Sequence, residues 1–295
     1  MPRAALLSIN ARVEGTVPST WEDPSLVQVW GPRYNVYAVA ARDLPVFTLG
    51  RLPDGGKTRQ KAEDLAARLR AFLGEGRMRY DDAGQALGVH GNALRYAALT
   101  GTLAIRWEGA RRPTVWIVAP PEIDAAQATV ELARRYLHVF GPATPEGFAR
   151  WAGIGAKKAA GAFDDLGDAR IPVQTPSGAA WILGKDEATI REPPGPAAPA
   201  RLLPSGDAYT LGMTSADRAL LVPDAKRRGE LWTPRVWPGA LLVAGDVVGT
   251  WRRAEGAVRI QTWQRLSGAA REAVVAEAES MPLPGPSGQI VVHWD

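Results

Sequence analysis

Side chains that bind phosphate groups and nucleobase edges recur at short intervals between residues 90 and 112. His90, Asn92 and Arg95 follow a glycine-containing turn, and Arg111 and Arg112 lie in a short loop bounded by glycine and proline. Arginine and asparagine form hydrogen bonds to base edges, and arginine in a loop more often contacts phosphate. These five residues predict a contact with double-stranded DNA. The alternative is a solvated helix face and a solvated hairpin tip.

The positive charge of the chain is concentrated in the same region. Residues 57–120 contain 11 Lys or Arg and 6 Asp or Glu, a net charge of +5, whereas the whole chain carries +4. A localised basic face is the electrostatic footprint of phosphate binding. On charge alone, ordinary surface solvation remains an alternative.

Two further basic pairs are candidate DNA contacts. Lys157 and Lys158 stand at the start of an expected helix, where free backbone N–H groups also favour phosphate. Arg252 and Arg253 end an expected strand near the C-terminus. We predict that both pairs contact the DNA backbone, with surface solvation again the alternative.

Two stretches of the chain share one order of expected elements: helix, turn, helix, strand, loop, strand. In the first they are residues 81–87, 88–92, 93–100, 103–107, 108–113 and 114–118. In the second they are residues 144–151, 153–155, 156–166, 171–174, 175–178 and 180–183. The helices have apolar residues at helical spacing and the strands alternate. Because this order is typical of a winged helix, the repeat predicts tandem winged-helix modules.

The remaining segments complete an α+β fold of tandem winged-helix modules followed by a small, mostly antiparallel β domain. Strands at 26–30 and 36–40, preceded by a helix at 4–13, resemble half of a third module. A Pro- and Ala-rich segment at 192–199 marks a linker. The predicted domains are a truncated first module, a second module, a third module and a C-terminal β domain with one helix, at residues 1–56, 57–124, 125–191 and 200–295.

Composition excludes several classes of chemistry. The chain has no cysteine, and its three histidines, His90, His138 and His293, are far apart. We therefore expect no metal site and no cofactor, because neither ligand clusters nor phosphate-binding glycine motifs are present. No apolar run reaches transmembrane length, no signal peptide is visible, and no coiled coil suggests a dimer. We expect a cytoplasmic monomer without membrane contact.

Several short phrases resemble the AlkZ/YcaQ family of bacterial winged-helix DNA glycosylases, which release alkylated or crosslinked purines. They are Phe140-Gly141-Pro142-Ala143-Thr144 with Phe148-Ala149 and Trp151, Leu202-Leu203-Pro204 with Asp207-Ala208-Tyr209 and Leu211-Gly212, and Val248-Gly249-Thr250-Trp251-Arg252-Arg253. The phrases occur in the family's order, and the similarity covers nearly the whole chain. Membership implies three winged helices around a DNA channel, a β domain, and base excision without metal or cofactor.

The resemblance places the catalytic signature, Gln followed by an apolar residue and then Gln or Asp, just before the first helix. That helix starts here at about Pro2, and no such tripeptide precedes it. Gln28-Val29-Trp30 is not a substitute, because it lies on an expected strand. The family's pocket-side strand corresponds to a segment that supplies four pocket candidates: Arg33, Tyr34, Asn35 and Tyr37. The alternative for the tyrosines is alternating core and surface positions of a strand.

The nearest carboxylates, Glu14, Asp23 and Asp43, are better explained by capping and surface roles than by catalysis. Three functions therefore compete: a DNA repair glycosylase with altered chemistry, a non-catalytic DNA binder acting as a lesion sensor or transcriptional regulator, and a protein-interaction module. The basic centre disfavours the last. The lack of a dimer signal disfavours a regulator that reads paired half-sites. Whether the chain is an enzyme is left open.

Overall fold

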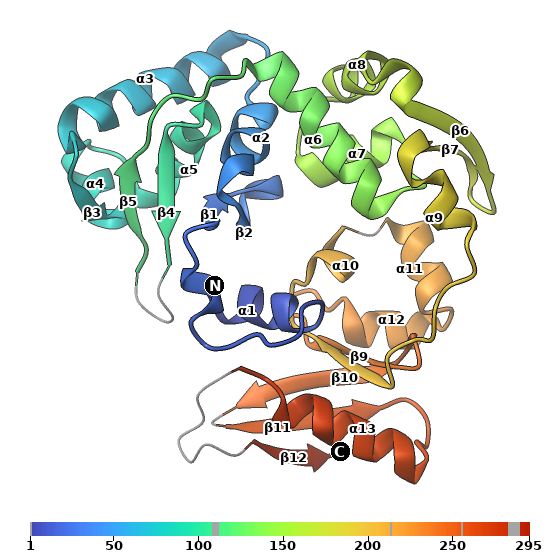
Figure 1. Ribbon diagram of the computed structural model, residues 1–295. Helices are drawn as coiled ribbons and strands as arrows, with labels where there is room; N and C mark the ends of the chain where they lie inside the picture. The colour runs from blue at the N-terminus through green and yellow to red at the C-terminus, as the bar shows by residue number, and fades with distance from the viewer. Residues whose placement is uncertain (1, 108–111, 213, 255, 283–289) are drawn as a thin grey trace. The chain divides into compact units, whose positions relative to one another are not determined.

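The computed structural model describes residues 2–107, 112–212, 214–254, 256–282 and 290–295 (Figure 1). The chain forms two compact units. The larger unit comprises residues 22–192, and the smaller unit combines Pro2–Trp21 with Pro193–Asp295. Among the described residues, no helix is both long enough and apolar enough to cross a membrane.

One antiparallel sheet organises the first part of the larger unit. Its strands lie in the order β2-β1-β4-β5-β3, and their bounds are Val36–Ala40, Leu26–Trp30, Leu103–Arg106, Thr114–Ile117 and Arg77–Arg79. β1 pairs antiparallel with β2 along its whole length and meets β4 where Gln28 faces Ile105. The predicted hairpins at 26–40 and 103–118 are therefore neighbours in a single sheet.

The central part of the chain has the connectivity expected of a winged helix. Its helices are α3 (Gly56–Leu73), α4 (Tyr80–Ala86), the 3₁₀ turn η5 (Gly91–Ala93), α5 (Leu94–Ala97) and the 3₁₀ turn η6 (Ala98–Thr100). The short strand β3 lies between α3 and α4 and pairs with β5, which also pairs with β4. Leu69, Leu94 and Ile105 are fully buried between the helices and the sheet. Trp30 of β1 completes this core.

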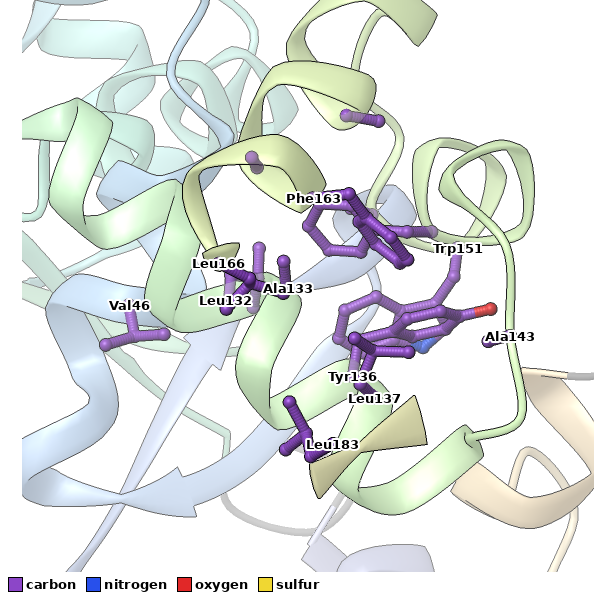
Figure 2. Close-up of a cluster of buried hydrophobic side chains, with 14 residues drawn as sticks. Val46, Leu132, Ala133, Tyr136, Leu137, Ala143, Trp151, Phe163, Leu166 and Leu183 are labelled. Carbon is purple, nitrogen blue, oxygen red and sulfur yellow. The ribbon is translucent and has the colours of Figure 1, made fainter. Parts of the chain in front are cut away.

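The rest of the larger unit packs around an aromatic core. Its elements are α2 (Leu44–Thr48), the 3₁₀ turn η4 (Leu49–Arg51), α6 (Ala125–Phe140), α7 (Pro145–Ala152), α8 (Ala156–Asp165), β6 (Arg170–Thr175), β7 (Gly178–Leu183) and α9 (Glu187–Arg191). Val46 from α2 and Tyr136 from α6 converge with Trp151 and Phe163 (Figure 2). The Tyr136 and Trp151 ring centroids are 5.1 Å apart. β6 and β7 form the hairpin that follows the two helices.

The smaller unit is a sheet with a helical cover. Its strands lie in the order β12-β11-β10-β9-β8, and their bounds are Val291–Trp294, Ala257–Thr262, Asp246–Ala254, Gly239–Val243 and Ala200–Leu203. β12 runs parallel to β11, and the other neighbours are antiparallel. The helices are α1 (Pro2–Asn10), α10 (Ala208–Leu211), α11 (Ser215–Leu221), α12 (Ala225–Leu231) and α13 (Gly268–Glu279).

The expected α+β class is confirmed, but the first module differs from its predicted outline of residues 1–56. The helix predicted at 4–13 is found as α1, yet it belongs to the smaller unit. Leu6 and Leu7 are buried there beside Leu202 and Leu241. Ser8 and Arg12 bind the buried carboxylate of Asp207. Apolar burial and this charge contact hold α1 against strands that lie far away in sequence.

Candidate nucleic-acid interface

The turn between α4 and α5 exposes two of the predicted DNA-contacting residues. His90 and Asn92 are both solvent-exposed. His90 Nδ1 accepts a hydrogen bond from the Asn92 backbone N–H at 3.2 Å, which caps the turn η5. A neutral ring that accepts at Nδ1 carries its proton on Nε2. The Nε2 donor and the Asn92 side-chain amide are therefore both available to an external partner, next to the helix expected to enter a groove.

The wing is described only in part. Arg111, a predicted contact, lies outside the described residues. Arg112 is exposed at the end of the loop and forms an ion pair with Asp81 near the start of α4. This pair ties the base of the wing to α4, so a phosphate that binds Arg112 competes with Asp81 for its guanidinium.

Lys157 and Lys158 have different environments although they are adjacent. Lys157 is exposed near the start of α8. Lys158 Nζ donates to the Leu52 carbonyl at 2.6 Å and to Asp54 Oδ1 at 2.7 Å. Lys158 therefore joins α8 to the segment after η4, and of the two lysines Lys157 is the one that faces solvent.

Arg252 and Arg253 lie on β10 of the smaller unit. Arg252 is exposed and donates from Nη2 to the Val236 carbonyl at 3.0 Å, and Arg253 is half-buried. No ion pair to a carboxylate engages Arg252 among the described residues. Its charge is therefore available to an anion.

The turn between β1 and β2 carries three of the four pocket candidates, Arg33, Tyr34 and Asn35, and its backbone is strained. Arg33 and Tyr34 have φ values of +53° and +59°, a left-handed conformation that non-glycine residues rarely adopt in succession. The turn is closed by hydrogen bonds from Gly31 N to the Asn35 carbonyl at 2.8 Å and from Tyr34 N to the Gly31 carbonyl at 3.0 Å. The strained turn presents Arg33 and Asn35 to solvent and directs Tyr34 inward.

Tyr34 packs against cations. The guanidinium carbons of Arg51 and Arg95 each lie 4.9 Å from the centroid of its ring. The ring of Tyr96 contacts it edge-on, with centroids 5.2 Å apart. Burial raises the pKa of Tyr34, while the Arg51 charge lowers it. The structure thus brings together a predicted DNA contact, Arg95, and a predicted pocket residue, Tyr34.

Arg51 is the residue that the sequence reasoning missed. Only 4% of it is exposed, and it donates from Nε to the Ala152 carbonyl at 2.8 Å and from Nη1 to the Trp30 carbonyl at 3.0 Å. Desolvation lowers its pKa to about 10, so it remains charged at neutral pH. The only sequence signal is an arginine between Gly50 and Leu52, which does not reveal that two other segments, at residues 30–34 and at Ala152, meet on it.

Tyr37 lies behind the same turn. Its ring is so close to Gly31 that a Cβ on the glycine would lie 2.6 Å from the tyrosine Cδ2, which accounts for glycine at that position. Its buried hydroxyl finds no hydrogen-bond partner in the part of the chain that the structure describes. Burial raises the pKa of Tyr37 to about 12.

The other polar residues near the turn have structural partners. Asp43 Oδ1 accepts hydrogen bonds from Arg135 at 2.7 and 3.0 Å, and Asp23 Oδ1 accepts from Ser25 N at 2.8 Å. Glu14 belongs to the smaller unit. The Gln28 side chain bonds to both backbone groups of Trp107, extending the β1–β4 contact. These structural contacts explain Asp23, Asp43 and Gln28 without a catalytic role for any of them.

Among the described residues, no group of three or more His, Asp or Glu side chains is placed to hold a metal ion. The donors that the larger unit does present are arginine, lysine, amide and phenol groups. Such groups bind phosphate oxygens and base edges.

Comparison with known proteins agrees with this chemistry. A solved structure, the Streptomyces sahachiroi DNA glycosylase AlkZ, superimposes with a TM-score of 0.77, covering 99% of this chain and 89% of that one at 19% identity. The curated "Interstrand DNA cross-link repair glycosylase" of the same organism is 33% identical over 135 residues, or 44% of this chain. The aligned part spans only 35% of that relative's length. The family model for DNA glycosylase AlkZ-like proteins matches residues 1–282, and the chain therefore belongs to the AlkZ-like DNA glycosylase family.

Proposed function

We propose that this protein binds double-stranded DNA through the larger unit and acts in DNA repair. The observation that carries this proposal is the exposed pair His90 and Asn92 ahead of α5, within a segment whose net charge is +5 over residues 57–120. A short helix with exposed donors, followed by a basic hairpin loop, is the arrangement with which a winged helix contacts the groove and backbone.

The substrate class follows from the relatives. One of them is named as an interstrand DNA cross-link repair glycosylase. We propose that this chain recognises duplexes carrying alkylated or crosslinked purines. Damage that weakens the stacking or pairing of an alkylated purine lowers the cost of exposing that base to a protein surface.

The sequence also bears on whether residues 1–295 catalyse base release. None of the eight glutamines is followed two residues later by Gln or Asp, so the family's signature is absent from these residues. Asp23 and Asp43 are occupied by turn and ion-pair contacts. These observations favour a non-catalytic DNA binder, a lesion sensor in particular, as the second candidate function.

The test of DNA binding is its dependence on salt. Neutralising several phosphates should make the affinity for a 20-base-pair duplex fall by orders of magnitude between ~50 and ~200 mM salt. Two duplexes of unrelated sequence should give the same slope, because phosphate contacts carry no sequence information. Binding that is absent at low salt, or that does not change with salt, would refute the proposal. Tighter binding to a methylated than to an unmodified duplex would support lesion recognition.

A further inference from the structure

Arg51 and Arg95 stand apart from most other arginines of the described chain. Ion pairs to carboxylates neutralise many of those others, among them Arg12, Arg59, Arg112, Arg135, Arg170, Arg191 and Arg201. Neither Arg51 nor Arg95 has a carboxylate within 4.0 Å among the described residues. Instead both guanidinium groups approach one neutral ring, that of Tyr34.

The two charges contact the same ring and are at least partly shielded from water. Each guanidinium carbon lies 4.9 Å from the same centroid, so they are no more than twice that distance apart. Arg51 is 4% exposed and Arg95 is half-buried. Like charges at this range repel more strongly away from bulk water. An anion placed beside them would relieve that repulsion.

Arg95 also has an unused donor. Its Nε is buried without a hydrogen-bond partner in the described part of the chain, although Nη2 donates to the Tyr96 hydroxyl at 3.2 Å. A buried donor without an acceptor is unfavourable. Because the Tyr96 oxygen accepts from Arg95, its own proton is available to another acceptor. Tyr96 is 37% exposed, so a ligand can approach the Arg95–Tyr96 pair from solvent.

We propose that Arg95 and Tyr96 form a binding site for one phosphodiester group of the DNA backbone, with Arg51 supplying a second positive charge from below. The Arg95 guanidinium binds the phosphate oxygens, and its Nε–H, which is buried in the free protein, gains an acceptor when the side chain shifts toward the ligand. Tyr96 donates its hydroxyl proton to one of them. Tyr34 contacts both arginines and is not a stacking platform for a base. The site rests on the proposed DNA binding and assigns it a specific contact.

Phosphate fits this corner better than a nucleobase. The ring of Tyr34 is already packed against two guanidinium groups and the edge of Tyr96. The available groups are donors and positive charges, which match the acceptor-only oxygens of a phosphodiester. The neighbouring turn adds the exposed Arg33 and Asn35.

The experiment compares Arg95→Gln and Tyr96→Phe with Arg191→Gln, an exposed arginine on α9 whose loss changes the net charge equally. The full chain is titrated with a duplex at several salt concentrations. We expect Arg95→Gln to weaken binding about tenfold and to lower the slope of log affinity against log salt by about one. Tyr96→Phe should weaken it about threefold with an unchanged slope. Arg191→Gln should match the wild type.

A second readout is independent of duplex binding. The Nε–H resonance of Arg95, assigned as the one missing in Arg95→Gln, should shift when the wild-type protein is titrated with pyrophosphate. A wild-type slope and affinity in Arg95→Gln would overturn the site while leaving the proposed function standing. A wild type that does not bind duplex refutes the proposed function. If the wild type does not bind duplex but pyrophosphate still shifts the Arg95 Nε–H resonance, the anion site stands and its assignment to DNA is wrong. An unmoved resonance overturns the site itself.

Discussion

Asp207 and Arg51 show two ways of burying a charge in this chain. The Asp207 side chain is fully buried and accepts hydrogen bonds from Ser8, Arg12 and the Tyr209 backbone N–H. The Arg12 guanidinium neutralises the charge of this carboxylate. Arg51 has no acidic partner among the described residues and is held by carbonyl oxygens and a ring. The first arrangement stabilises a fold, whereas the second keeps positive potential for a ligand.

The unsatisfied hydroxyl of Tyr37 leads to a stability prediction. Replacing Tyr37 with Phe removes a buried hydroxyl without a partner among the described residues and keeps the ring against Gly31. The free energy of unfolding at pH 7 should rise by ~1 kcal/mol, because no hydrogen bond is lost. Denaturant titration of both proteins measures it, with Tyr209→Phe, an exposed ring, as the control. A less stable Tyr37→Phe protein would show that the hydroxyl has a partner.

The same residue predicts a pH dependence. Folding raises the pKa of Tyr37 from 10.0 to about 12, so the folded state holds the proton more tightly than the unfolded chain. Its contribution is therefore present below pH 10 and is lost as the pH rises toward 12. The stability advantage of Tyr37→Phe should grow over that interval. A constant difference between the two proteins from pH 9 to 11.5 would contradict the raised pKa.

Arg112 predicts a reciprocal pair of effects on DNA affinity. Arg111→Ala with Arg112→Ala should weaken duplex binding and change stability by less than ~0.5 kcal/mol, since exposed substitutions have small effects. Asp81→Asn removes the partner of Arg112 and should strengthen binding, because the guanidinium no longer has a competing carboxylate. Affinity and melting temperature are measured together. An unchanged affinity in the double variant would refute the wing assignment.

At the scale of elements, α1 is held by a contact that spans most of the chain. Arg12 bonds Asp207 through both terminal nitrogens, at 2.9 and 2.7 Å, and Ser8 Oγ donates to Asp207 at 2.6 Å. The same carboxylate caps α10 through Tyr209 N. One side chain therefore fixes two helices of the smaller unit.

Asp207→Ala should therefore destabilise the smaller unit. The substitution leaves the Tyr209 N–H and the Ser8 hydroxyl without their acceptor and removes the partner of Arg12, at a cost of ~2–3 kcal/mol. Arg12→Ala should cost at least as much, because it leaves the fully buried Asp207 carboxylate without its cationic partner. Chemical denaturation gives the energies, and hydrogen exchange at α1 amides locates them. A loss below ~0.5 kcal/mol in either variant would show that the buried ion pair does not stabilise the smaller unit.

At the scale of the whole molecule, two observations lead to opposite expectations about base release. Family membership favours glycosylase activity, whereas the absence of the Gln-containing tripeptide from residues 1–295 disfavours it. The chain matches the AlkZ-like model over residues 1–282, while no Gln is followed two positions later by Gln or Asp. Binding and base release are therefore expected to separate. The proposed DNA-contacting groups are among residues 1–295, whereas the tripeptide that the family resemblance assigns to steadying the sugar cation and orienting water is not.

The corresponding prediction concerns methylated purines. In a single-turnover assay with protein in excess over a methylated duplex, residues 1–295 should release base slowly or not at all, because losing a positioned catalytic group costs ~10²–10⁴ in rate. A catalytically inert DNA binder of similar charge serves as control for spontaneous depurination. Release far above that background would show that another residue acts, and Tyr34, Asn35 and Asp43 would be substituted first.

The sequence by itself determined the local elements and the family. Helical and alternating periodicity located α4, α7 and α8 and the β1–β2 hairpin, because these patterns depend only on neighbours along the chain. The three-residue strand β3 was missed, since it is too short to show alternation. The short phrases around Trp151 and Trp251 identified the family because several occur in a fixed order.

Only the tertiary structure decided which distant segments meet. It placed α1 with the C-terminal strands, joined β1 to β4 in one sheet, and buried Arg51 against Trp30, Tyr34 and Ala152. No periodicity encodes these contacts, because they depend on complementary packing and charge between residues far apart in the chain. Arg95 and Lys158 look alike as basic residues on helices. Arg95 packs against the ring of Tyr34, where we propose that it binds an anion, whereas Lys158 donates a hydrogen bond to Asp54.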